Sequence, residues 1–162
     1  MHIDQALIGQ LQKKYFNDPA KVVSLKAGEY IMRQNTPNTR LYLVLKGLMA
    51  GYLDTGMGKK QEIFRSEAQM FVGVHSFFSA SYSAYADVVA LKASKLAYIE
   101  LSDFREEEKE TRLEDFMPVI VHELSARQLY TTDLMLEKEA AMKKLYESEK
   151  LSTLGHMAAG LA

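Results

Sequence analysis

A segment rich in aromatic residues and empty of basic ones lies in the middle of the chain. Residues 66–91 contain no Lys or Arg, and their only formal charges are Glu67 and Asp87. Within this segment a single histidine, His75, stands among five aromatic side chains: Phe71, Phe77, Phe78, Tyr82 and Tyr85. Apolar walls with a few hydroxyls bind flat ligands of low charge, whereas a phosphate needs a cation or several N–H donors. The segment therefore favours either a pocket for an aromatic, for example quinone-like, molecule or a hydrophobic core that binds nothing.

The sequence offers no other cluster of residues that could do chemistry. It has no cysteine, which excludes disulfides, thiolate metal sites and thiol catalysis. Its histidines are too dispersed to form a metal motif, and no phosphate-binding loop or nucleophile elbow is present. Twenty basic against 21 acidic residues give a net charge of −1, so no basic field attracts nucleic acid or an anionic membrane. We expect no catalytic residue, no metal, no cofactor, and neither nucleic acid nor a membrane as a partner.

Residues 22–101 have the pattern of short strands that would position these aromatic side chains. Gly, Asn, Pro, Thr or Ser separate eight apolar runs: VVSL, YIM, LYLVL, LMAGYL, EIF, MFVGV, VVAL and LAYI. In the third run the leucines share one face of a strand while Tyr42 and Val44 share the other, so both faces need cover. The 162 residues are enough for one such domain and a short appendage. The pattern predicts a small β-barrel or roll, preceded by a short helix within residues 1–16.

From Ser102 onward the pattern is helical, with no glycine before Gly155. Ser102 and Asp103 are candidate N-caps, and Pro118 is expected near the start of the main helix, where its missing N–H matters least. Four apolar residues at spacings of four, three and four form a helix-packing seam: Leu113, Met117, Ile120 and Leu124. Three polar residues interrupt the continued seven-residue repeat: Arg127, Thr131 and Lys138. The seam predicts a parallel homodimer through an imperfect coiled coil.

Two stretches resemble the cyclic nucleotide-binding domain family. They are LKAGEYIMRQNTPNTRLYLVLKGLMAGYL, residues 25–53, and MFVGVHSFFSASYSAYADVVALKASKLAYIELSDF, residues 70–104. The resemblance covers roughly residues 10–125. It implies a mainly β fold with flanking helices, a double-stranded β-helix or jelly-roll β-roll, followed by a long C-terminal dimerisation helix.

The binding chemistry departs from the pattern of that family. The family's phosphate-binding cassette begins with Gly-Glu, whose carboxylate binds the ribose 2′-hydroxyl, and ends with an Arg that pairs with the cyclic phosphate. Here Gly73 is present, but Val74 stands at the Glu position and Ala84 at the Arg position. Losing one charge-assisted bond costs about 1.5–3 kcal/mol, so we expect no ordinary cyclic AMP binding. The candidate pocket comprises Phe71, Gly73, Val74, His75, Tyr82, Ala84 and Tyr85.

Three states of this candidate pocket stay open. It is collapsed on its own side chains, or it holds a small aromatic molecule of unknown identity. Because relatives of this fold include haem sensors, the third alternative is haem with His75 as an axial ligand.

The end of the chain, EKLSTLGHMAAGLA at residues 149–162, resembles the opening of the phosphoacceptor helix of bacterial sensor histidine kinases. By that alignment the sequence stops one residue before the phosphorylated histidine, and His156 is not that residue. The small residues Gly155, Ala158 and Gly160 allow close contact between helices. The resemblance implies a cytoplasmic two-component kinase whose partner is a response regulator.

The two resemblances together predict a sensory fragment in three parts. Residues 1–110 form the sensory domain, residues 111–150 the coiled-coil helix, and residues 151–162 the start of the kinase helix. Two alternatives remain: a transcription regulator with the same sensory roll, or a dimerisation scaffold whose pocket binds nothing.

Overall fold

The computed structural model describes residues 3–161, so Met1, His2 and Ala162, which belong to the predicted end segments, lie outside it. The chain divides into two compact units, Met1–Glu123 and Leu124–Ala162. The first unit opens with the helix expected near the start of the chain, α1 (Gln5–Tyr15), which Asp4 caps by accepting a hydrogen bond from the Ala6 N–H at 3.0 Å. None of the helices in residues 3–161 is long and apolar enough to cross a membrane.

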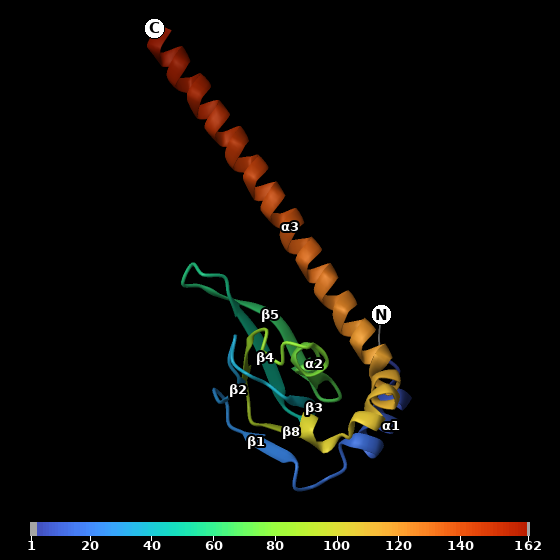
Figure 1. Cartoon of the computed structure of the whole chain (residues 1–162). Helices are drawn as coiled ribbons and strands as arrows, with labels where there is room; N and C mark the ends of the chain where they lie inside the picture. Colours follow the sequence, from blue (N-terminus) through green and yellow to red (C-terminus); the bar gives the residue numbers. More distant parts are fainter. Residues whose placement is uncertain (1–2, 162) are drawn as a thin grey trace. The chain divides into compact units, whose positions relative to one another are not determined.

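The first unit is built around the predicted β-roll (Figure 1). One four-stranded sheet has the order β1-β8-β3-β6 and the other β2-β7-β4-β5, and every pairing is antiparallel. All eight apolar runs of the sequence contribute to strands. The strands are β1 (Val22–Leu25), β2 (Tyr30–Met32), β3 (Arg40–Lys46), β4 (Leu48–Asp54), β5 (Lys60–Glu67), β6 (Phe71–Val72), β7 (Asp87–Ala90) and β8 (Ser94–Glu100).

The sheet containing β3 is covered on both faces, as its side-chain alternation requires. Leu41 and Leu43 pack outward into a cluster built with α1, the short helix α2 (Val74–Phe78) and the beginning of the C-terminal helix. Tyr42 and Val44 point the other way, into the interior of the roll. A single strand therefore contributes to two hydrophobic cores, one under the helices and one inside the roll.

The helical part begins later than the sequence suggests. Residues 101–103 and 106–108 form two 3₁₀ turns, η1 (Leu101–Asp103) and η2 (Glu106–Glu108), instead of the expected start of an α-helix. Neither Ser102 nor Asp103 is an N-cap, because both lie inside η1, whose N-cap is Glu100; the Asp103 carboxylate accepts a hydrogen bond from the Glu100 N–H at 2.9 Å. The long helix α3 (Lys109–Leu161) then runs for 53 residues. Pro118 lies inside α3, nine residues after its first residue, so its placement near the helix start was wrong.

The face that α3 turns to the core of the first unit also differs from the predicted seam. Phe116 and Val119 are buried in the outer cluster, and Ile120 packs against it. Leu113 and Met117, which were expected to lead the seam, are exposed. The first turns of α3 thus have two apolar faces, and the predicted seam combined Ile120 from the inner face with Leu113 and Met117 from the exposed one.

Candidate functional site

The cassette region consists of β6, α2, a loop and the start of β7. It turns at Gly73, which caps the N-terminus of α2 in the left-handed conformation with a φ of 89°. A Cβ at this position would lie 2.9 Å from the Arg40 carbonyl oxygen and 3.2 Å from Asn38 Nδ2. Glycine is therefore required here for both its φ angle and the close approach of β3.

The predicted pocket residues are divided between two hydrophobic clusters and the surface. Phe71 and Val74 are buried in the outer cluster beneath the helices, whereas Ala84 is buried inside the roll. Tyr82 and Tyr85 lie at the surface, with 38% and 42% of their areas exposed. Within the predicted set, the half-buried His75 contacts the ring of Tyr85, with centroids 5.8 Å apart and planes at 62°.

A cluster of the roll's own apolar side chains lies in its interior. Ala84 packs there among apolar residues that include Met32, Met49 and Val88. On β4, Gly51 makes room for the ring of Phe64, its neighbour on β5, and a Cβ on Gly51 would collide with that ring. A ligand that entered the interior would have to displace these packed side chains.

The backbone groups of Ala84, in the cassette, already form hydrogen bonds with the turn after β2. The Ala84 N–H donates to the Thr36 carbonyl at 2.8 Å, and the Ala84 carbonyl accepts from the Asn35 N–H at 2.9 Å. At the position of the family's phosphate-binding Arg there is thus neither a guanidinium nor an available backbone N–H. A phosphate bound at this position could accept the Ala84 N–H only if the hydrogen bond from this N–H to the Thr36 carbonyl were broken.

A buried polar chain fixes the other end of the cassette. Asn38 Nδ2 donates to Ser76 Oγ at 2.6 Å and to the Arg40 carbonyl at 2.9 Å, while Ser76 Oγ donates to the Gly73 carbonyl at 3.2 Å. The Asn38 N–H donates to the Tyr82 carbonyl at 2.8 Å, holding Tyr82 at a φ of 45°. A bulky residue is rarely left-handed, so these bonds hold the cassette loop in a constrained shape.

A basic side chain does face the interior side of the sheet, and it comes from outside the cassette segment. Arg40 lies on the same face of β3 as Tyr42. Its guanidinium pairs with Glu100 and stacks on the Tyr98 ring at 4.2 Å from the centroid. The charge of Arg40 is therefore already neutralised by a carboxylate on the neighbouring strand.

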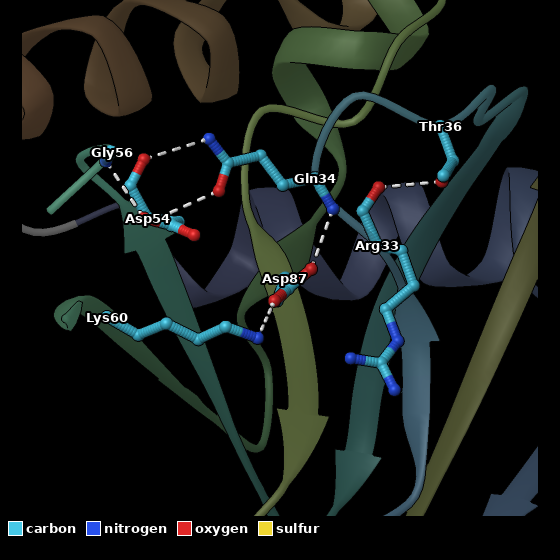
Figure 2. Close-up of polar contacts among 7 residues, drawn as sticks. All are labelled: Arg33, Gln34, Thr36, Asp54, Gly56, Lys60 and Asp87. Atoms are coloured by element: carbon cyan, nitrogen blue, oxygen red, sulfur yellow. Dashed lines mark hydrogen bonds and ion pairs between the residues drawn. The ribbon is translucent and has the colours of Figure 1, made fainter. Parts of the chain in front are cut away.

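The most connected polar cluster surrounds Asp87, at the point where the cassette enters β7 (Figure 2). Its buried carboxylate accepts from the Gln34 N–H at 2.7 Å and from Lys60 Nζ at 2.6 Å. Burial alone would raise the pKa of Asp87, but these two hydrogen bonds and the nearby charges of Lys60 and Arg33 outweigh it and hold the pKa below its usual value. The carboxylate thus stays ionised and ties β7 to β5 and to the turn after β2.

The neighbours of Asp87 are themselves held in place. The Gln34 side chain exchanges hydrogen bonds with the backbone of Asp54, accepting from its N–H at 2.9 Å and donating to its carbonyl at 3.4 Å (Figure 2). Arg33 stacks over the Tyr30 ring at 3.4 Å from the centroid. The arrangement is a structural clasp with no nucleophile or acid–base pair. Its only signal in the sequence is a lone aspartate, Asp87, directly before the apolar run VVAL.

No metal site occurs in residues 3–161, where no three His, Asp or Glu side chains lie close enough together to hold an ion. For haem, the candidate ligand His75 packs edge-on against the Tyr85 ring, which occupies space beside the imidazole. The described residues therefore do not form a binding site for a metal ion, and the space beside His75 that haem would need is taken by Tyr85.

A model of the family described as the cyclic nucleotide-binding domain matches residues 22–110. No curated protein matches the sequence. Among solved structures, the c-di-GMP responsive global regulator CLP of Xanthomonas campestris has a TM-score of 0.61 at 20% identity, with 80% of this chain and 62% of that chain covered. The catabolite activator protein of Thermus thermophilus has a TM-score of 0.58 at 19% identity, with 83% and 59% covered.

The regulatory subunit of a cAMP-independent protein kinase A from Trypanosoma brucei is also similar, with a TM-score of 0.56 at 16% identity and coverage of 80% and 53%. This chain spans about half to three fifths of these three proteins. None of the three is a histidine kinase, so the similarity in fold lends no support to the kinase prediction.

Proposed function

Because this chain belongs to the cyclic nucleotide-binding domain family, whose model matches more than half of its 162 residues, we propose that it is a sensory domain that has lost the family's anion clamp. The observation that carries the proposal is the placement of the two substituted signature positions. Val74 is buried under the helices and Ala84 inside the roll, each in an apolar cluster. Both positions therefore serve packing, and the signal is something other than a cyclic nucleotide bound in the usual way.

Two proteins of similar fold respond to other signals, which supports a different effector for this chain. The Xanthomonas regulator is c-di-GMP responsive, and the trypanosome kinase is cAMP-independent. For this chain, the accessible aromatic side chains at the cassette, His75, Tyr82 and Tyr85, are the proposed contact surface for a flat ligand of low charge.

In this proposal two copies of α3 pair in parallel, and the paired helices transmit the signal. A ligand or partner that binds two arrangements of the roll and its helix with different affinity shifts their populations. The large apolar side chains that α3 leaves exposed, such as Leu145 and Leu154, support its association with a second copy.

Two output modules are candidates, and different observations favour them. The similar folds of two bacterial regulators favour a transcription regulator. The residues from Glu149 onward, which continue α3 without a break to Leu161, favour by their sequence a histidine kinase with a response regulator as its partner. The reading frame after Ala162 separates them: a histidine followed by an acid supports the kinase, and a helix-turn-helix sequence supports the regulator.

Calorimetry tests the sensory proposal. Titration of cyclic AMP, cyclic GMP and c-di-GMP into the chain is expected to give no saturable heat for the two cyclic mononucleotides. A thermal-shift screen of aromatic compounds should find ligands whose effect is lost in the double variant His75→Ala with Tyr85→Ala. Micromolar affinity for cyclic AMP would contradict the loss of the anion clamp, and saturable binding of c-di-GMP, which carries two negative charges, would contradict a ligand of low charge.

A further inference from the structure

Four exposed lysines gather at the end of the roll away from the cassette turn. They are Lys26 in the turn after β1, Lys46 at the end of β3, and Lys92 and Lys95 around the start of β8. The cassette turns at Gly73, beside Arg40 at the beginning of β3. The length of β3, about 20 Å, therefore separates the cassette turn from these lysines.

The strand pairing brings the lysines together. Lys46 and Lys95 are direct partners in the antiparallel pairing of β3 with β8. On the other side of β8, Lys95 is opposite Ser24, which lies two residues before Lys26. Directly opposed residues on neighbouring strands have Cβ atoms about 4.5–5.5 Å apart, and like charges placed in this way destabilise a sheet.

A buried serine fixes the two turns that carry Lys46 and Lys92. Ser94 Oγ donates to the Lys92 carbonyl at 2.8 Å and accepts a hydrogen bond from the Leu48 N–H at 3.0 Å. Gly47, with a φ of 108°, passes so close to Ser94 that a Cβ on this glycine would lie 2.5 Å from the Ser94 Cα. The turn between β3 and β4 is therefore held against the turn between β7 and β8, and the lysines project from a fixed base.

None of the four lysines forms an ion pair with a carboxylate of residues 3–161. Elsewhere in the first unit, Lys14 pairs with Asp115 and Lys60 with Asp87, each at 2.6 Å. The lysines thus form a local basic surface on a chain whose net charge is −1. Because the opposed pair costs stability and no carboxylate of the described chain offsets it, we expect an anionic partner from outside.

Two carboxylates at the same end of the roll restrict the kind of anion. Glu29 lies in the turn with Lys26, whose N–H donates to Glu29 Oε2 at 3.2 Å, and Glu67 is the strand partner of Leu48. A membrane or a nucleic acid presents negative charge uniformly, so it would face these carboxylates as well as the lysines. A protein segment places its carboxylates individually and can reach the lysines while avoiding Glu29 and Glu67.

Two exposed apolar side chains border the lysines. Leu91, directly before Lys92, has 36% of its surface exposed. Met70 has 42% exposed, and its carbonyl accepts a hydrogen bond from the Val44 N–H at 2.9 Å, next to the end of β3. The surface therefore suits a segment that combines carboxylates with a few apolar side chains.

We propose that this lysine surface, formed by Lys26, Lys46, Lys92 and Lys95, binds an acidic segment of another protein. The lysines form ion pairs with the carboxylates of that segment, and Leu91 and Met70 contact its apolar residues. The lysine surface shares no residue with the cassette or with α3, so the proposal is independent of the proposed function.

Fluorescence anisotropy with a labelled peptide tests the proposal. A peptide of glutamates with leucine at every fourth position should bind the chain saturably, and the double variant Lys46→Gln with Lys95→Gln should bind it at least tenfold more weakly. The matched control is Lys13→Gln with Lys59→Gln, at two exposed lysines outside the surface, and should stay within twofold. No saturable binding by the wild type, or an equal loss in both double variants, would overturn the proposal.

Two other polyanions test the class of partner. Vesicles containing phosphatidylserine and a single-stranded DNA oligonucleotide should both bind the wild type more weakly than the peptide at the same salt concentration. Equal or tighter binding of either one would overturn the assignment to a protein segment.

Thermal unfolding gives a second measurement, which needs no ligand. Lys95→Gln removes the like-charge pair, so its melting temperature should rise by about 1–3 °C, whereas Lys13→Gln should leave the melting temperature unchanged. A melting temperature of Lys95→Gln that stays the same or falls would overturn the repulsion between Lys46 and Lys95 on which the proposal rests.

Discussion

The interior of the roll and the far half of α3 both contain large apolar side chains, but the roll buries them and the helix leaves them exposed. Inside the roll, Met49 and Leu96 have no exposed surface. On the helix, Leu145 and Tyr146 have 61% and 67% of their surfaces exposed. The roll therefore buries a core within one chain, whereas the far half of α3 leaves its large apolar side chains exposed, which is the basis of the proposed association with a second copy.

This difference between the buried roll and the exposed helix indicates which region a ligand or partner can change most easily. Ligands that enter the roll must displace packed side chains and break backbone pairs at Ala84, which makes the interior a rigid scaffold. Association of α3 has no such obstacle, because its contact surface is already exposed. Under the proposed function, the first unit supplies stability and the second supplies association.

The largest effect is expected from Phe116→Ala, which tests whether the first unit is complete in itself. Phe116 is fully buried and contacts the rings of Tyr15, Phe71 and Phe78, with centroids 5.1, 6.0 and 5.5 Å away. Its truncation should lower the free energy of unfolding by about 3–5 kcal/mol, measured by urea denaturation. Leu113→Ala, on the exposed face of the same helix, should lower it by less than about 1 kcal/mol at monomer concentrations. Similar losses for both variants would contradict the assignment of the two faces.

Ala84→Arg tests the closed interior by restoring the family's cationic side chain. Ala84 has 2% of its surface exposed, so the new side chain must overpack the roll and bury a charge. We expect a loss of about 3 kcal/mol in thermal or urea unfolding and no gain of cyclic AMP binding. Tyr85→Arg, at an exposed neighbouring position, should cost less than about 1 kcal/mol. An Ala84→Arg variant that stays stable and binds cyclic AMP would show that the pocket is open.

Asp87→Asn is expected to have the smallest effect and a characteristic pH dependence. Losing the charge weakens the hydrogen bonds from Lys60 and the Gln34 N–H, which should cost about 1–2 kcal/mol near neutral pH. Because the pKa of Asp87 is lower in the folded than in the unfolded state, its contribution is fully present above about pH 5. That contribution disappears as the pH falls below about 4, so the unfolding curves of wild type and variant should converge in acid. A difference that persists unchanged into strong acid would contradict an ionic clasp.

Alternation along the chain was sufficient to predict the strands, because each short run needed one buried face. VVSL and YIM coincide with β1 and β2, and the alternation of Tyr42 with its leucine neighbours correctly indicated a sheet covered on both sides. The helix face was harder to assign. Leu113 and Phe116 are both apolar, and only the tertiary structure decides which of two apolar faces packs on the roll.

The candidate site was only partly predictable for a related reason. The loss of the two signature residues at 74 and 84 is visible in the sequence, but their burial in different clusters depends on the turn at Gly73. The Asp87 clasp joins residues from β5, β7 and the turn after β2, so no local pattern could reveal its partners. The spacing of apolar residues along the chain does not indicate which distant strands contact each other.

The most direct test of the central claim is a titration of the isotopically labelled chain with cyclic AMP, followed by amide NMR shifts at Gly73, Val74 and Ala84. A roll that is closed by its own side chains predicts no saturable shift at these three amides up to millimolar nucleotide. Saturable shifts at all three with a micromolar midpoint would show that the family's pocket still works and would contradict the account.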